Sequence, residues 1–141
     1  MKVRDVLQHK GSEIVMISPD ATVRELVALL AEHNIGAVIV SSDGARLDGI
    51  VSERDVVRNL QTLEPLSEKP VSAIMTEAAN TCAPGSEVGS LRVQMTEQRV
   101  RHLPVLDDGK LVGIISIGDV VKSAIDELQF ERDQLHSYVN Q

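Results

Sequence analysis

Apolar residues recur along this chain with two periodicities, one typical of amphipathic helices and one typical of short buried strands. Two stripes have helical spacing: Val23, Leu26, Val27 and Leu30, then Val88, Leu91 and Met95. Short apolar runs predict strands over 37–40, 49–51, 103–106 and 112–115. Asp43-Gly44 and Asp108-Gly109 separate the members of each strand pair, and Asp-Gly is typical of hairpin turns. The pattern therefore predicts the order strand, helix, strand, turn, strand, helix, and it predicts this order twice.

The two halves share their landmarks, which indicates an internal duplication. Pro19 matches Pro84 at a shift of 65 residues, and Gly49 matches Gly113 at a shift of 64. Short helices are predicted over 3–8 and 71–75, ahead of each half, and 61–69 reads as a Pro-containing linker. We predict a first repeat over 1–62, a linker over 63–69, a second repeat over 70–123 and a helical extension over 124–141.

Three positions predict how the helices begin. Thr22 and Glu25 have the spacing of a capping box at the start of the first long helix. Ser52-Glu53-Arg54-Asp55 and Ser116-Ile117-Gly118-Asp119 each follow a strand end and open a helix with the same spacing. A cap alone explains either occurrence. A strand-to-helix junction also presents free amides to phosphate, and a carboxylate one turn in suits a ribose diol. Because the set occurs at matching positions of both repeats, we favour the functional interpretation.

The last helix is predicted from about 119 to 139, well past the end of the repeat. Its apolar positions have heptad-like spacing, interrupted by Arg132: Val121, Ile125, Leu128, Leu135 and Val139. One interpretation is a helix packed on its own domain, and the other is an arm that packs against a second subunit. We favour the arm, since the chain's two aromatic residues, Phe130 and Tyr138, also lie here.

Composition narrows the class of protein. Hydrophobic residues make up 43% and charged residues 25%, which is typical of a globular domain. No apolar run approaches the roughly 18 residues that span a bilayer, and the first residues do not resemble a signal peptide, so we expect a cytoplasmic protein without a membrane partner. The net charge of −7 argues against a nucleic-acid-binding surface. The four scattered histidines lack metal-ligand spacing. The neighbours of Cys82, Thr81 and Ala83, predict a strand, on which Cys82 is expected to be a small buried apolar side chain.

Several of these motifs resemble those of the CBS-domain family. The resemblance is carried by Arg101-His102-Leu103-Pro104-Val105, by the Gly-apolar-apolar-Ser-x-x-Asp ends of both repeats and by the proline ahead of each first helix. It covers about 3–122 and is strongest with stand-alone paired-CBS (Bateman) proteins of bacteria. It implies an α/β (α+β) fold in which two βαββα repeats pack by their sheets with pseudo-twofold symmetry, followed here by a C-terminal helix.

The resemblance also implies two ligand clefts between the repeats. The first would combine Ser52, Arg54, Asp55, Thr81, Arg101, His102, Leu103 and Pro104. The second would combine Ser116, Asp119, Met16, Ile17, Gly36, Ala37 and Val38. In each, Asp55 or Asp119 would hold a ribose and the facing strand would contact adenine. Arg54 and Arg101, joined by Arg99, favour phosphate in the first cleft, where the second has Gly118 and Gly36.

Each of these residues has a structural alternative. Arg101 fits a solvated surface, Arg54 and Arg58 fit an exposed helix face, and His102 fits a half-buried strand position. His102 is not a convincing general base, because no nucleophile or carboxylate accompanies it in sequence.

Three functions follow from these features. The first is a non-enzymatic sensor of AMP, ATP, NAD(H) or a related adenine ligand, acting as a homodimer on an unidentified regulated protein. The second is a dimerisation scaffold with vestigial clefts. The third, an enzyme, is disfavoured because the sequence has no phosphate-binding loop, nucleophile elbow or metal cluster, and we expect no catalytic cofactor.

Overall fold

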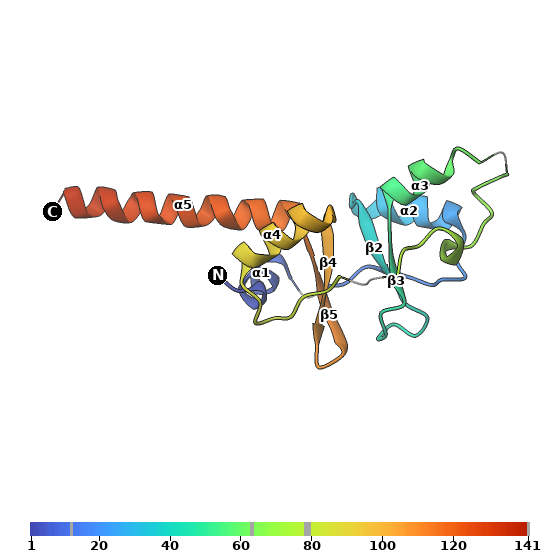
Figure 1. Cartoon of the computed structure of the whole chain (residues 1–141), viewed down its shortest axis with the longest axis horizontal. Helices are drawn as coiled ribbons and strands as arrows, with labels where there is room; N and C mark the ends of the chain where they lie inside the picture. The colour runs from blue at the N-terminus through green and yellow to red at the C-terminus, as the bar shows by residue number, and fades with distance from the viewer. Residues whose placement is uncertain (12, 63, 78–79, 141) are drawn as a thin grey trace.

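The computed structural model describes residues 1–11, 13–62, 64–77 and 80–140, and Figure 1 shows their arrangement. The first half contains α1 (Val3–Lys10), β1 (Met16–Ile17), α2 (Val23–His33), β2 (Ala37–Val40), β3 (Gly49–Ser52) and α3 (Glu53–Asn59). The second half contains the 3₁₀ helix η1 (Val71–Ala73), α4 (Val88–Gln98), β4 (His102–Asp107), β5 (Lys110–Ser116) and α5 (Ile117–Val139). The tandem α/β architecture predicted from the sequence is therefore present, with one small sheet in each half.

The first sheet has the order β1-β2-β3. β1 pairs in parallel with β2, so α2 crosses over between them, and β2 pairs antiparallel with β3. Thr22 caps α2 by accepting a hydrogen bond from the Glu25 amide at 3.1 Å. The side chain of Glu25 does not return this bond, so the predicted capping box is only half formed. The stripe of α2 packs on the sheet through Val23 and Leu26, which are 2% and 0% exposed.

The second sheet pairs β4 antiparallel with β5 around the predicted Asp-Gly turn, where Asp108 and Gly109 have φ values of 49° and 81°. The strand expected around Cys82 is reduced to one bridge with Val105. Proline explains part of this loss. In the first sheet the Ile39 amide donates to the Val15 carbonyl, whereas Pro104 occupies the equivalent position 65 residues later and has no N–H.

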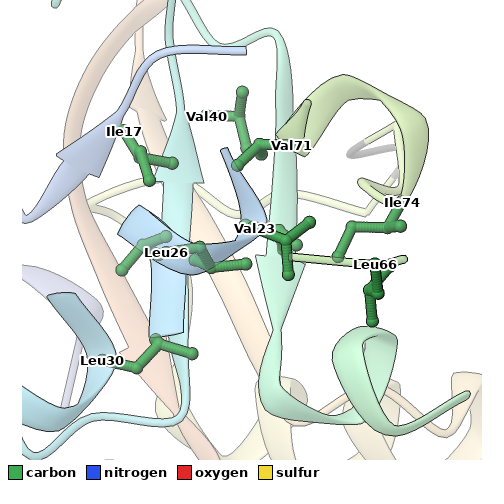
Figure 2. Packing of buried hydrophobic residues seen from close by; sticks show 10 residues of the cluster. Ile17, Val23, Leu26, Leu30, Val40, Leu66, Val71 and Ile74 are labelled. Atoms are coloured by element: carbon green, nitrogen blue, oxygen red, sulfur yellow. The ribbon is translucent and has the colours of Figure 1, made fainter. Parts of the chain in front are cut away.

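The two hydrophobic cores exchange their short leading helices. The core of the first sheet contains Leu66, Val71 and Ile74 from the later segment, as Figure 2 shows. The core of the second sheet contains Val3 from α1, which is 0% exposed. Matching hydrogen bonds hold both helices, since the Val3 amide donates to Ser86 and the Val71 amide donates to Ala21. Each leading helix thus packs on the half that it does not precede, and the linear division of the chain remains a prediction.

The C-terminal helix begins in the second core and then leaves it. Val120 and Ser123 are buried, whereas every described residue from Ile125 to Asn140 is exposed. At a rise of 1.5 Å per residue, the 23 residues of α5 are about 34 Å long. The distal part of α5 extends away from the rest of the chain as a free rod (Figure 1). Within the described residues, no helix is long and apolar enough to cross a membrane.

Candidate functional site

The two strand-to-helix junctions have nearly the same local geometry. At the first, the Ser52 amide donates to Oδ2 of Asp55 at 2.8 Å and the Asp55 amide donates to Oγ of Ser52 at 3.4 Å. At the second, the corresponding distances between Ser116 and Asp119 are 2.9 and 3.1 Å. Both are complete capping boxes at the starts of α3 and α5. The caps fix both carboxylates in defined positions at the start of a helix.

The surroundings of the two carboxylates differ. Nζ of Lys10, in the last turn of α1, lies 2.7 Å from Oδ2 of Asp119 and 2.8 Å from the carbonyl oxygen of Ile114. Burial alone would raise the pKa of Asp119, but hydrogen bonds from Lys10 and the Ser116 amide outweigh it and hold the pKa below its usual value. Asp55 forms no ion pair within the described residues. Lys10 was not among the predicted site residues, because the helix predicted from the sequence ended at Gln8.

Three arginines surround one pocket, which lies between the end of α4 and the starts of α3 and α5. The pocket has a volume of about 340 Å³, and Arg54, Arg99 and Arg101 line it together with Met95, Thr96, Val100 and Ile117. None of the three guanidinium groups forms an ion pair in the described part of the chain. The structure therefore brings together the cations that the sequence suggested for one cleft. Clustered, unneutralised guanidinium groups favour binding of an anion such as phosphate.

The backbone at Arg99 supports the importance of this pocket. Arg99 ends α4 with a left-handed φ of 55°, and Asn34 ends α2 in the same way with a φ of 52°. Asparagine tolerates this conformation, whereas for other side chains it costs roughly 1–2 kcal/mol. The strained turn places Arg99 at the pocket wall. At the positions equivalent to Arg54, Arg99, Arg101 and Ile117, the other half has Gly118, Asn34, Gly36 and Glu53.

The two predicted clefts meet at Gly36. A Cβ atom placed on Gly36 would lie 3.3 Å from Oε1 of Glu53 and 3.9 Å from Cε1 of His102. His102, predicted for the first cleft, therefore adjoins a residue predicted for the second. Backbone hydrogen bonds reinforce each half here, with the Glu53 amide donating to Gly36 and the Ile117 amide donating to Arg101, at 2.9 and 2.8 Å. Any side chain at position 36 would crowd this junction.

His102 is held mainly in its neutral form. Burial is the largest influence and lowers the pKa of His102, and the positive charge of Lys10 lowers it further. Asp119 and Glu53 act in the opposite direction, and Arg101 lowers the pKa slightly. Glu53 is a neighbour of the site that was not among the predicted site residues, since its sequence position indicated only a helix cap. His102 responds to charges from both halves of the molecule.

The remaining predicted residues are either buried or half-buried. Ile17, Ala37, Val38 and Leu103 are at most 9% exposed and their side chains belong to the core, so only their backbone groups can face a ligand. Pro104 is also buried, while Met16, Thr81 and Ser116 are half-buried. The thiol of Cys82 is 9% exposed, and burial raises its pKa to about 11, so it is protonated at neutral pH.

A family model for the CBS domain matches residues 3–62 and 71–126. This chain belongs to the CBS-domain family. The CBS domain-containing protein CBSX3 of Arabidopsis thaliana, described as mitochondrial, is 35% identical over 147 residues, covering 97% of this chain and 71% of that protein. The structure of CBS-domain protein ATU1752 from Agrobacterium tumefaciens is 39% identical, with a TM-score of 0.83 over 88% of this chain and 99% of that one.

A further CBS-domain structure is that of a complex with a nucleotide. The CBS domain protein PAE2072 from Pyrobaculum aerophilum, complexed with AMP, is 26% identical with a TM-score of 0.74. The alignment covers 84% of this chain and 89% of that one. The paired CBS architecture of the family thus accommodates a nucleotide in at least one relative, and this makes nucleotide-type regulatory binding the function to test here.

Proposed function

We propose that this protein is a non-enzymatic regulatory module that binds an adenine nucleotide, of the AMP, ATP or NAD(H) type, in the first cleft. The observation that carries the proposal is the pocket of about 340 Å³ lined by Arg54, Arg99 and Arg101. Arg54 of this pocket directly precedes Asp55, which forms no ion pair within the described residues and is held by the Ser52 cap. Three free guanidinium groups suit phosphate, and the neighbouring carboxylate suits a ribose diol.

Each predicted residue has a role in this proposal. Asp55 and Ser52 would hold the ribose, and the arginines would hold the phosphate groups. Backbone groups from Thr81 and from the strand His102–Pro104 would contact the adenine ring. Because aromatic residues are absent before Phe130, the ring would pack against aliphatic side chains. The bound form of PAE2072 supports the ligand class, and the arginine cluster supports the choice of cleft.

Calorimetric titration tests this function. Wild type, Asp55→Ala and Arg101→Ala are each titrated with AMP, ADP, ATP, NAD and S-adenosylmethionine. We expect one adenine ligand to bind the wild type and to lose at least tenfold in affinity in both variants, because a charge-assisted contact is removed. Arg58→Ala is the matched control, since Arg58 lies on the same helix as Arg54 but outside the pocket. Equal affinity in Asp55→Ala and the control would contradict this assignment.

A second candidate function is a dimerisation scaffold with vestigial clefts, acting as a homodimer. The exposed apolar side chains favour it. Apart from Met1, they lie on or directly after the outer helices: Val27, Val57, Leu60, Val93, Val121, Ile125, Leu128, Phe130, Leu135, Tyr138 and Val139. Such surfaces mark protein contacts. Dimerisation is compatible with both functions, and a folded dimer that binds none of the five ligands would favour the scaffold. We further propose a cytoplasmic location and an unidentified regulated protein as partner.

A further inference from the structure

One cation distinguishes the two carboxylates that the proposed function assigns to ribose. Asp119 is paired with Lys10, whereas among the residues that the structure describes Asp55 has only its own cap. The Lys10 ammonium is anchored twice, because it also donates to the Ile114 carbonyl at 2.8 Å. The pair is partly shielded from water, with the side chains of Lys10 and Asp119 35% and 22% exposed. Shielding of this kind strengthens an ion pair compared with one fully in solvent.

The asymmetry comes from the lengths of the two leading helices. Equivalent hydrogen bonds place Val3 and Val71 in matching positions, and likewise Arg4 and Ser72, which donate to Pro84 and Pro19. Met16 lies 13 residues after Val3, whereas its repeat equivalent, Thr81, lies only 10 residues after Val71. The three additional residues make room for a longer helix, since α1 has eight residues and η1 has three. The last turn of this longer helix carries Lys10, and no Lys or Arg lies between positions 71 and 81.

Hydrogen-bonding capacity turns this difference into a difference in ligand binding. Oδ2 of Asp119 already accepts from the Ser116 amide and from Lys10, which uses both lone pairs. A ribose diol that engages both carboxylate oxygens must displace the ammonium group. Oδ2 of Asp55 accepts from the Ser52 amide and from the Ser52 hydroxyl at 3.1 Å. That hydroxyl can rotate away and donate elsewhere, so Asp55 can accept a diol without breaking an ion pair.

Resting on the proposed function, we propose that Lys10 is the residue that determines which cleft binds. It closes Asp119 to ribose, so the chain holds one nucleotide, in the first cleft. Removing the ammonium while keeping the aliphatic stem opens the second carboxylate. Lys10 and Asp119 belong to the same chain, and α1 reaches the second half because Val3 packs into the core of that half.

The test compares binding stoichiometry in Lys10→Met, Lys10→Arg and wild type by calorimetry with AMP and ATP. We expect one site per chain in wild type and in Lys10→Arg, which keeps the ion pair. Lys10→Met is expected to gain a second site, or to tighten a weak one at least tenfold. Lys69→Met is the matched control, since Lys69 pairs with Glu64 at 2.9 Å with a similar side-chain exposure of 32%. Thermal unfolding verifies that every variant is folded.

Substitutions at the carboxylates separate the role of Lys10 from the proposed nucleotide binding in the first cleft. The site gained in Lys10→Met should disappear in Lys10→Met/Asp119→Ala and persist in Lys10→Met/Asp55→Ala. A folded Lys10→Met that still binds one nucleotide, through Asp55, overturns the role of Lys10 and leaves the proposed function standing. Weaker binding at an Asp119-dependent site also overturns it, because Lys10 would then be a ligand contact. If no variant binds AMP or ATP, and none binds NAD in a parallel titration, both hypotheses fail.

Discussion

Replacing Val3 with alanine tests whether the two halves exchange their leading helices. Val3 is 0% exposed within a core formed by Cys82, Val88, Leu91 and their neighbours, more than 75 residues away in sequence. The substitution removes two methyl groups, or about 1.6 kcal/mol of transfer free energy at about 0.8 kcal/mol each. The cavity left behind adds to this, and the better helix propensity of alanine offsets a few tenths. We expect a loss of about 2 kcal/mol.

Urea unfolding measures this loss directly. For a chain of 141 residues, about 2 kcal/mol corresponds to a drop in Tm of roughly 6–8 °C. The m-value should be unchanged, because the substitution does not alter the surface exposed on unfolding. Val27→Ala is the control, since Val27 is 47% exposed on α2 and should lose less than about 0.5 kcal/mol. If Val3→Ala lowers the free energy of unfolding no more than this control does, α1 does not pack on the second half. The pairing of Lys10 with Asp119 would then be refuted as well.

Two further predictions concern pH and association. Because the pKa of His102 is lowered in the folded chain, the unfolded chain takes up the proton first as pH falls through about 6.5. Acidification from pH 7.5 to 5.5 should therefore lower the free energy of unfolding, by at most about 1.4 kcal/mol from this residue. If acidification lowers the Tm of His102→Gln as much as that of the wild type, His102 is not the cause. Leu128→Asn/Leu135→Asn should convert a dimer to a monomer in light scattering. Phe130→Ser, on the opposite side of α5, should not, and a double variant that stays dimeric would place the interface elsewhere.

Local chemistry made much of the fold predictable. The Asp108-Gly109 turn, the two Ser-x-x-Asp caps and the stripe of α2 each depend on residues within a few positions of one another. Such features follow from backbone preference and periodicity alone. The grouping of Arg54 with Arg101 in one cleft was implied by the resemblance to CBS domains, and both residues line the same pocket.

The features that escaped prediction depend on contacts between distant segments. Lys10 and Asp119 are 109 positions apart, and their pairing requires α1 to cross to the second half. No local pattern marks that crossing, since Val3 and Val71 would suit either core equally. The shortened strand at Cys82 was also hidden, because its missing hydrogen bond belongs to Pro104 on another strand. Sequence periodicity describes each element, and it does not state which element covers which sheet.

Duplication followed by divergence explains how one fold can present two different sites. The caps that fix Asp55 and Asp119 have remained alike, because each helix start needs them for stability. The surrounding charges carry no such constraint. Three arginines, including the residue that precedes the first carboxylate, line one pocket, while a lysine from an extended helix neutralises the second carboxylate. Since net attraction for a phosphate-bearing ligand depends on these charges and not on the caps, the two halves can share a backbone and still differ in what they bind.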